Sequence, residues 1–394
     1  MSNLPLLSGK TILQVIPDLS AGGAEQTVLD MAEAIIAAKG EALVATSGGR
    51  MVEDLERLGG EWIEMDAASK NPLVIFQNAN ALVDLISKRG VNLVHARSRA
   101  PAWSAWRAAH AAQIPFVTTY HGAYSGTSGP KKAYNSVMAK GDLVIANSRW
   151  IGEHVQAVHG VPEDRIVIIP RGVDFSRFDP GLIGVDRTSQ LRRSWGLSDD
   201  NDRIILFLPA RLTEWKGQSL ALAALGLLTP EERTKLVLVL AGDAQGRTGY
   251  VEKLQNQIAT YGLLEASRIT GHCTDMPAAL AASDIVLAPS LRPEAFGRTA
   301  AEASAMGRPV IAADHGGARE TVLDGETGAR FPPGDARALA AAIRSLVSVG
   351  HATRRGMGAE GRKHVLAHFS KGGLQAATLS VYSALMTQGV SRHA

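Results

Sequence analysis

Two glutamates, Glu294 and Glu302, lie eight positions apart in the stretch RPEAFGRTAAEASAMGRPV, residues 292–310. The stretch follows an apolar run of strand type and is rich in alanine, which predicts a loop carrying Glu294 and then a helix containing Glu302. A helix start offers free N–H groups to phosphate or hydroxyl oxygens, and Gly297 lets a ligand approach the backbone closely. Two carboxylates flanking such a start could bind hydroxyls of a sugar and of a ribose. Spacing alone favours the plainer alternative of two solvated surface glutamates.

Cations, glycines and a histidine follow other apolar runs. Arg211 and Lys216 in ARLTEWKGQS precede a predicted helix. Two positive charges there suit a diphosphate without a metal ion, and the alternative is an exposed basic pair. Gly22 and Gly23 in SAGGAEQT match neither G-x-G-x-x-G nor the P-loop pattern, although their amides could face a phosphate. His121 ends its strand in TTYHG, and a lone histidine is more often structural than catalytic.

These residues need elements that place them at the edges of sheets. Short apolar runs alternate with helical patterns along both halves of the chain, which predicts parallel sheets with right-handed crossovers. Each half is therefore expected to be a doubly wound α/β domain. Ligands bind outside the carboxyl ends of parallel strands, so two such domains facing each other would place a cleft between those ends. The predicted strands are 11–16, 42–46, 92–96, 116–120, 143–146 and 166–169, then 203–209, 235–242, 284–289 and 309–314.

Length, charge and cysteine content narrow the class of protein. The chain has 394 residues, 45% of them hydrophobic, which is enough for two domains with real cores. A net charge of +3 argues against nucleic acid as a partner. A single cysteine, Cys273, excludes an internal disulfide framework and is typical of a reducing compartment. No uninterrupted apolar run reaches the roughly 18 residues of a membrane span, so we expect a cytoplasmic protein whose membrane contacts are peripheral.

The motifs, taken in order, resemble the retaining glycosyltransferases of family 4, which have the GT-B fold. The resemblance spans about residues 11–331 through GGAE (22–25), YHG (120–122), IPRGVDFSRFDP, ARL…KG (210–217), AGDA, GHCTDMP (271–277), the E-x7-E pair, GRPVIA and HGGARETV. It implies two Rossmann-like domains facing across a cleft. It also implies a metal-independent, retaining transfer from a UDP- or GDP-sugar, with no other cofactor.

The expected domain boundaries follow from the linker and from this resemblance. Residues 171–190 contain Gly, Asp and Pro without a clear period and are the predicted linker. We expect an acceptor-side domain over 1–185 and a nucleotide-sugar-binding domain over 186–371. In similar proteins the last helix packs back on the first domain, and the resemblance implies the same for 372–394.

The resemblance also assigns roles to the two glutamates and their neighbours. It implies that Glu294 contacts the donor sugar and that Glu302 holds the ribose hydroxyls. The backbone amides of Ala295, Phe296 and Gly297 would contact sugar and phosphate.

The remaining roles concern the leaving group, the reacting centre and the base. Arg211 and Lys216 would neutralise the leaving diphosphate, and His121 would lie near the reacting centre. With attack assisted by the departing phosphate, no protein nucleophile is needed, and the catalytic set is His121, Arg211, Lys216 and Glu294. Further donor-binding residues would be Gly22, Gly23, Gly242, His272, Cys273, Met276 and Arg298.

Some positions depart from the family's common pattern. Arg171 stands where Asn is common, Ala295 replaces a frequent glycine, and Arg298 stands where an aliphatic residue is common; we interpret Arg298 as a contact to phosphate or base. His364 and His368 have the i, i+4 spacing of a helical metal pair but lack the accompanying glutamate, so no metal site is predicted.

The first half of the chain contains basic residues interleaved with aromatic ones. Such a mixture suits anionic headgroups or a phosphorylated lipid at the inner face of the cytoplasmic membrane, and the alternative is a half-buried helix with a solvated face. The residues are Arg97, Arg99, Trp103, Trp106, Arg107, Lys131, Lys132 and Lys140.

Three functional classes remain. The leading one is hexose transfer to a glycolipid or to an oligosaccharide or polysaccharide precursor in cell-envelope (lipopolysaccharide) biosynthesis. The alternatives are a nucleotide-sugar epimerase of the same architecture and a non-catalytic sugar-nucleotide-binding protein.

Overall fold

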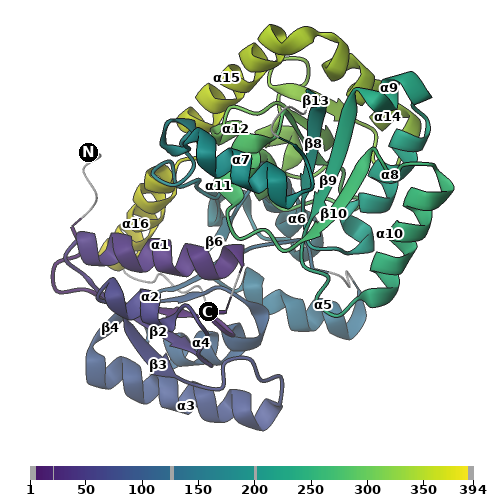
Figure 1. Cartoon of the computed structure of the whole chain (residues 1–394). Helices are drawn as coiled ribbons and strands as arrows, with labels where there is room; N and C mark the ends of the chain where they lie inside the picture. Colours follow the sequence, from purple (N-terminus) through teal and green to yellow (C-terminus); the bar gives the residue numbers. More distant parts are fainter. Residues whose placement is uncertain (1–5, 21, 125–127, 199–201, 389–394) are drawn as a thin grey trace. The chain divides into compact units, whose positions relative to one another are not determined.

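The computed structural model describes residues 6–20, 22–124, 128–198 and 202–388, and these divide into two compact units (Figure 1). The first unit comprises Met1–Gly172 together with Lys371–Ala394, and the second comprises Val173–Ser370. The sequence analysis placed the boundary after residue 185. Residues 173–185 lie instead with the second unit, because Val173 and Phe178 are buried in its core.

The first unit is built on a parallel sheet, with seven strands within the described part of the chain. Its strand order is β3-β2-β1-β4-β5-β6-β7. The chain therefore winds outward from β1 in one direction, and then returns to β4 and winds outward in the other, as a doubly wound domain does. The strands are β1 (Thr11–Val15), β2 (Glu41–Thr46), β3 (Glu61–Glu64), β4 (Val91–Ala96), β5 (Phe116–Tyr120), β6 (Leu143–Ala146) and β7 (Ile166–Ile168).

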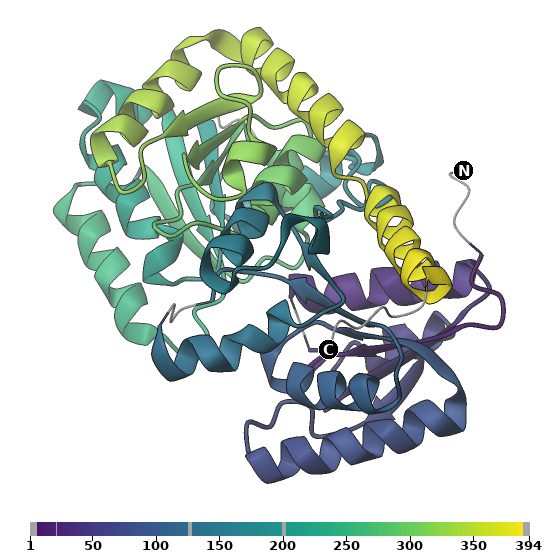
Figure 2. The ribbon, with the colours of Figure 1, turned by 180° about the vertical axis from the view of Figure 1, so that it is seen from behind.

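Helices cover both faces of this sheet. In Figure 2, α1 and α16 lie side by side, and α3 and α4 pack together beyond the strands. The return of α16 to α1 includes a hydrogen bond of 2.7 Å from Gln375 Nε2 to the carbonyl oxygen of Asp30. The helices are α1 (Gly23–Ala37), α2 (Val52–Arg57), α3 (Pro72–Arg89), α4 (Arg99–Ala111), α5 (Gly129–Asn135), α6 (Arg149–His159) and α16 (Lys371–Gln388), with 3-10 turns η1 (Ser136–Ala139) and η2 (Glu163–Arg165).

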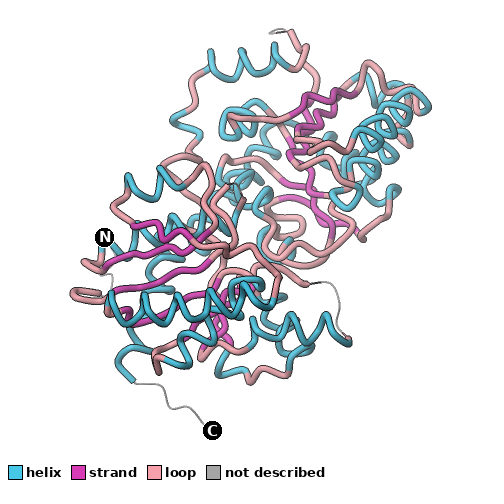
Figure 3. Tube along the Cα trace, turned by 90° about the horizontal axis from the view of Figure 1, so that it is seen from below, coloured by secondary structure: helices cyan, strands magenta, loops and turns pink. Residues whose placement is uncertain are grey.

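The second unit repeats the doubly wound plan with six strands among its described residues, in the order β10-β9-β8-β11-β12-β13. Figure 3 shows the strands of each unit side by side, with helices flanking them. The strands are β8 (Ile204–Pro209), β9 (Leu236–Ala241), β10 (Ser267–Gly271), β11 (Ile285–Ala288), β12 (Val310–Ala313) and β13 (Gly328–Phe331).

The helices of the second unit bury both faces of its sheet. Along β9, Val237 and Val239 enter one hydrophobic cluster and Leu238 and Leu240 enter another, because successive strand residues point to opposite faces. The helices are α7 (Val185–Ser194), α8 (Gln218–Gly226), α9 (Pro230–Thr234), α10 (Thr248–Thr260), α11 (Met276–Ala282), α12 (Arg298–Ala305), α13 (Ala318–Thr321), α14 (Ala336–Ser348) and α15 (Gly350–His368), with turns η3 (Pro180–Leu182) and η4 (Glu214–Lys216).

The structure confirms the α/β class and the ten strands predicted from sequence. Three further strands, β3, β10 and β13, were not predicted. Over the part of the chain that is described, no helix is both long and apolar enough to cross a membrane.

Candidate active site

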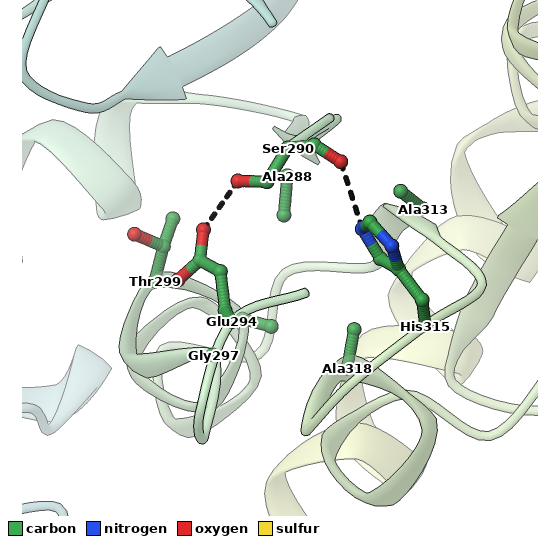
Figure 4. Close-up of a pocket in the computed structure, with 9 residues that line it drawn as sticks. Ala288, Ser290, Glu294, Gly297, Thr299, Ala313, His315 and Ala318 are labelled. Carbon is green, nitrogen blue, oxygen red and sulfur yellow. Dashed lines mark hydrogen bonds between the residues drawn. The ribbon is translucent and has the colours of Figure 1, made fainter. Parts of the chain in front are cut away.

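Glu294 lies in the loop after β11 and lines a small pocket with Ser290 and His315 (Figure 4). Its Oε1 accepts hydrogen bonds from the Ser290 hydroxyl and, at 2.7 Å, from Lys216 Nζ. The Ser290 carbonyl oxygen in turn lies 2.8 Å from His315 Nε2. The carboxylate is thus held by residues that follow two strands, β8 and β11, and a residue that follows β12 contacts the Ser290 backbone.

Lys216 reaches Glu294 because two loops are in close contact. Gly217 has a φ of +80°, and a Cβ there would lie 2.1 Å from the Pro289 carbonyl oxygen, so only glycine fits. The Lys216 ammonium also lies 4.2 Å from the Trp215 ring centroid. Its side chain is 14% exposed, and that of Glu294 is 20% exposed, so solvent screens this ion pair less than a surface pair.

The loop that carries Glu294 rests on two glycines of the HGGARETV motif. The Gly317 amide donates to the Glu294 carbonyl oxygen at 2.8 Å. A Cβ on Gly316 would lie 2.4 Å from that same oxygen, and one on Gly317 would lie 2.5 Å from Phe296 Cα. Sequence reasoning did not name Ser290, His315 or this glycine pair as site residues. Their position just after β11 and β12 was the signal that could have found them.

Glu302 lies within α12, and its side chain is only 13% exposed. Arg298, one turn earlier, donates to Glu302 Oε1 from Nη2 at 2.6 Å and from Nε at 3.1 Å. The helix begins after Gly297, whose φ is +85°. Phe296 is buried against Phe369, with ring centroids 5.3 Å apart, so its ring belongs to the core of the second unit. Ala295 is half-buried beside it.

The other predicted donor residues follow β8, β9 and β10. Arg211 is exposed, and no hydrogen bond or ion pair of its guanidinium is found within the described chain. Gly242 is required by packing, because a Cβ there would lie 1.9 Å from the Ala210 carbonyl oxygen. His272 is exposed, whereas Cys273 and Met276 pack against the core, and burial raises the pKa of the Cys273 thiol. Nothing here marks Cys273 as a nucleophile.

The predicted site residues of the first unit lie at the start of α1 and just after β5. Gly22 precedes α1 with a φ of +143°, and Gly23 is the first residue of that helix. Glu25 is partly buried there, and burial is the main cause that raises its pKa. His121 follows β5, and its Nδ1 lies 3.2 Å from Arg171 Nη2. Gly22, Gly23 and His121 thus belong to the first unit, and every other predicted site residue belongs to the second.

Two polar side chains of the first unit form a buried network with their neighbours. Arg97 is 3% exposed and donates to Gln14 Oε1 from Nη2 at 2.6 Å and from Nε at 3.1 Å. His95 contacts the hydroxyls of Thr119 at 2.7 Å and of Tyr382 at 2.6 Å. Arg97 therefore belongs to the interior, not to the basic surface in which the sequence analysis had grouped it.

Aromatic and basic residues of α4 pair with residues of other elements. Lys140 Nζ lies 4.5 Å from the Trp106 ring centroid, and the Arg107 guanidinium lies 5.2 Å from that of Phe76. The Trp103 indole donates to a backbone oxygen. Arg107, Lys140, Lys131 and Lys132 are exposed, and Arg99 lies over the Tyr124 ring at 4.1 Å.

Comparison with known proteins decides the family. Residues 190–364 match the family described as "Glycosyl transferases group 1", and residues 21–177 match "Glycosyltransferase Family 4". The chain is 31% identical over 310 residues to the D-inositol 3-phosphate glycosyltransferase of Xylanimonas cellulosilytica, covering 74% of this chain and 72% of that relative. This chain belongs to glycosyltransferase family 4.

Other members resemble this family 4 glycosyltransferase along different lengths. A GDP-mannose-dependent alpha-(1-6)-phosphatidylinositol monomannoside mannosyltransferase of Mycolicibacterium smegmatis is 32% identical over 218 residues, which is 52% of this chain and 53% of that one. The crystal structure of a glycosyltransferase from Rickettsia africae has a TM-score of 0.88 and 32% identity, covering 96% and 98% of the two chains. The resemblance and the GT-B fold predicted from sequence are confirmed.

Proposed function

We propose that this glycosyltransferase moves a hexose from a UDP- or GDP-sugar to a glycolipid or polysaccharide-precursor acceptor in cell-envelope assembly. We further propose that the transfer retains the anomeric configuration and needs no metal ion. The observation that carries the proposal is the cluster of Lys216, Glu294 and Ser290 at the carboxyl edge of the second sheet, near the start of the helix that bears Glu302.

The second unit would hold the donor. A diphosphate oxygen would take Lys216 Nζ as a hydrogen-bond donor, and the exposed Arg211 would supply a second positive charge as the leaving group develops. Glu294, still held by Ser290, would accept from a sugar hydroxyl. Glu302 would accept from the ribose through Oε2, because Arg298 donates to Oε1. These two cations would supply the charge that a metal ion provides in other enzymes.

The first unit would supply the acceptor contacts. The Xylanimonas relative is named for an inositol phosphate and the Mycolicibacterium relative for a phosphatidylinositol, and both of these compounds carry phosphate. Exposed Lys131, Lys132 and Arg107 would favour an acceptor or a membrane surface of the same charge. An anionic glycolipid is therefore the acceptor class we propose, and lipopolysaccharide precursors are one such class.

A thermal-shift screen without metal and with chelator tests the donor half. Uridine, guanosine, adenosine and cytidine diphosphates and their common hexose conjugates would be compared on the wild type and on Glu302→Gln. Glu360→Gln, which changes an exposed helical glutamate, is the matched control. We expect the nucleotides of one base to raise the unfolding temperature of the wild type and of Glu360→Gln. Glu302→Gln should lose this increase. No shift with any nucleotide would contradict the donor site.

Product analysis tests the transfer. The donor found by the screen would be incubated with anionic glycolipid acceptors, and the products would be resolved by mass spectrometry and by NMR of the anomeric proton. A new glycoside with the donor's anomeric configuration is expected. An epimerised donor, or no product despite donor binding, would replace transfer with one of the other two functional classes.

A further inference from the structure

Arg171 and His121 form a hydrogen bond whose direction can be deduced. Arg171 lies just after β7, and His121 lies just after β5, two strands away in the same sheet. The distance from Arg171 Nη2 to His121 Nδ1 is 3.2 Å. A guanidinium has only donors and stays protonated in proteins, so Nδ1 must accept. An accepting Nδ1 carries a lone pair, which leaves the ring's proton on Nε2.

The surroundings of the His121 ring also favour its neutral form. Burial is the main cause that holds the pKa of His121 well below its ordinary value, and the positive charges of Arg171 and Arg97 add to it. His95, on the neighbouring strand, is buried and also has a pKa well below its ordinary value. Glu25 exerts its charge on Arg171, and burial raises the pKa of that carboxyl. An imidazolium at His121 would therefore face two cations.

His95 shows why the deduction is specific to His121. The partners of the His95 ring are the hydroxyls of Thr119 and Tyr382, and a hydroxyl can either donate or accept. Either tautomer of His95 satisfies those contacts. Arg171 can only donate, so it selects one tautomer of His121.

We propose that Arg171 is a positioning residue that holds His121 as the neutral Nε2–H tautomer, so that Nε2 donates a hydrogen bond to an oxygen of the substrate. The Nε2 atom is buried and makes no hydrogen bond within the described part of the chain. A buried donor of this kind is costly unless a ligand satisfies it. The ligand atom opposite Nε2 is then an acceptor: a hydroxyl, ring or phosphate oxygen.

One consequence concerns the proton of the acceptor, and it rests on the proposed function. With its proton already on Nε2 and a guanidinium on Nδ1, His121 does not take the proton of the attacking hydroxyl. During transfer, the bond between the sugar C1 and the diphosphate oxygen breaks, and the bond between C1 and the acceptor oxygen forms. The acceptor's proton passes to the departing diphosphate, which restores the balance of charge.

The direct test is long-range 1H–15N correlation NMR of the histidine rings in the full-length protein without substrate. His121→Gln identifies the signals of His121. We expect the Nε2–H pattern in the wild type, unchanged between about pH 5.5 and 8. In Arg171→Leu we expect mixed tautomers and titration nearer the ordinary value of about 6.5. Arg171→Lys should restore a donor to Nδ1, and Arg57→Leu, an exposed arginine of α2, should leave the wild-type pattern.

The expected change in the pKa of His121 in Arg171→Leu also predicts a kinetic effect. The wild-type kcat/KM should be flat on its acid side, whereas that of Arg171→Leu should fall from pH 6.5 to 5.5, by up to about five-fold, as His121 becomes charged. An Nδ1–H pattern in the wild type, or a folded Arg171→Leu that keeps the wild-type NMR pattern, would overturn the proposal. The NMR result needs no transfer, so its failure is distinguishable from failure of the proposed function.

Discussion

Lys216 Nζ lies 2.7 Å from Glu294 Oε1, although the two residues are 78 positions apart in the chain. The pair joins the loop after β8 to the loop after β11. In the free protein the Glu294 carboxylate therefore neutralises the Lys216 ammonium, which we propose binds the diphosphate of the donor. Donor binding would exchange one anionic partner of Lys216 for another, with no net loss of ion pairing.

Lys216→Met should slow transfer more than it weakens nucleotide binding. In the proposed transfer the ammonium would act on charge that develops as the diphosphate departs, and removing one such group costs about 10²–10³ in kcat. Steady-state kinetics and calorimetric titration of the nucleoside diphosphate separate the two effects. Lys253→Met, which removes an exposed lysine paired with Glu214, is the control. A variant with wild-type kcat would exclude this role for Lys216.

Arg298→Leu should weaken binding of the nucleoside diphosphate through Glu302. Arg298 donates two hydrogen bonds to Glu302 Oε1, and exposed ion pairs are worth up to about 1 kcal/mol, or about five-fold in affinity. The effect should disappear with a 2′,3′-dideoxynucleotide and in a Glu302→Gln background. An undiminished effect in that background would mean that Arg298 contacts the nucleotide directly.

The first unit should lose stability as the pH falls below about 6.5. Burial is the main cause of the lowered pKa of His95, with the charge of Arg97 next. The unfolded chain then binds a proton that the folded chain does not, so stability is full above the unfolded pKa and decreases below it. One such histidine removes about 1.4 kcal/mol between pH 7.5 and 5.5. Urea unfolding of wild type and His95→Gln at both pH values should show a smaller pH dependence in the variant.

Gly242→Ala should destabilise the second unit by about 1–3 kcal/mol, because its Cβ would lie 1.9 Å from a backbone oxygen. Gly249→Ala in α10 is the matched control, since a Cβ there has no heavy atom within 4 Å. That control should be slightly more stable, because alanine favours a helix over glycine. Equal urea midpoints for the two variants would contradict the packing argument.

Replacing Lys131 and Lys132 with glutamate should reduce flotation with anionic liposomes. Each lysine near a surface contributes about 1 kcal/mol to attraction by anionic lipid. Lys253→Glu combined with Lys363→Glu makes the same change of charge on exposed residues of the second unit. If the wild type does not float, or if both double variants lose flotation equally, the proposed membrane surface is excluded.

Nine of the ten predicted strands are central in their sheets, and the tenth, β7, is an edge strand whose three residues are all apolar. All six residues of β9 are buried because helices cover both faces of a central strand, and this produces an apolar run. The missed strands β3, β10 and β13 are all edge strands. The interior of β3 is only half-buried, and all of β10 after its first residue is too, so polar residues are accepted there and no apolar run reveals the strand.

The sequence by itself determined the alternation of strands and helices, and it determined which charged and glycine-rich loops follow strands. Buried strands must be apolar and parallel strands end at a common edge, so both features can be read locally. Only the tertiary structure decided the partners of single polar side chains. Arg97 meets Gln14 across 83 positions, and Arg171 meets His121 across 50. Such pairs form only when the order of strands in the sheet brings distant loops together, and no local pattern encodes that order.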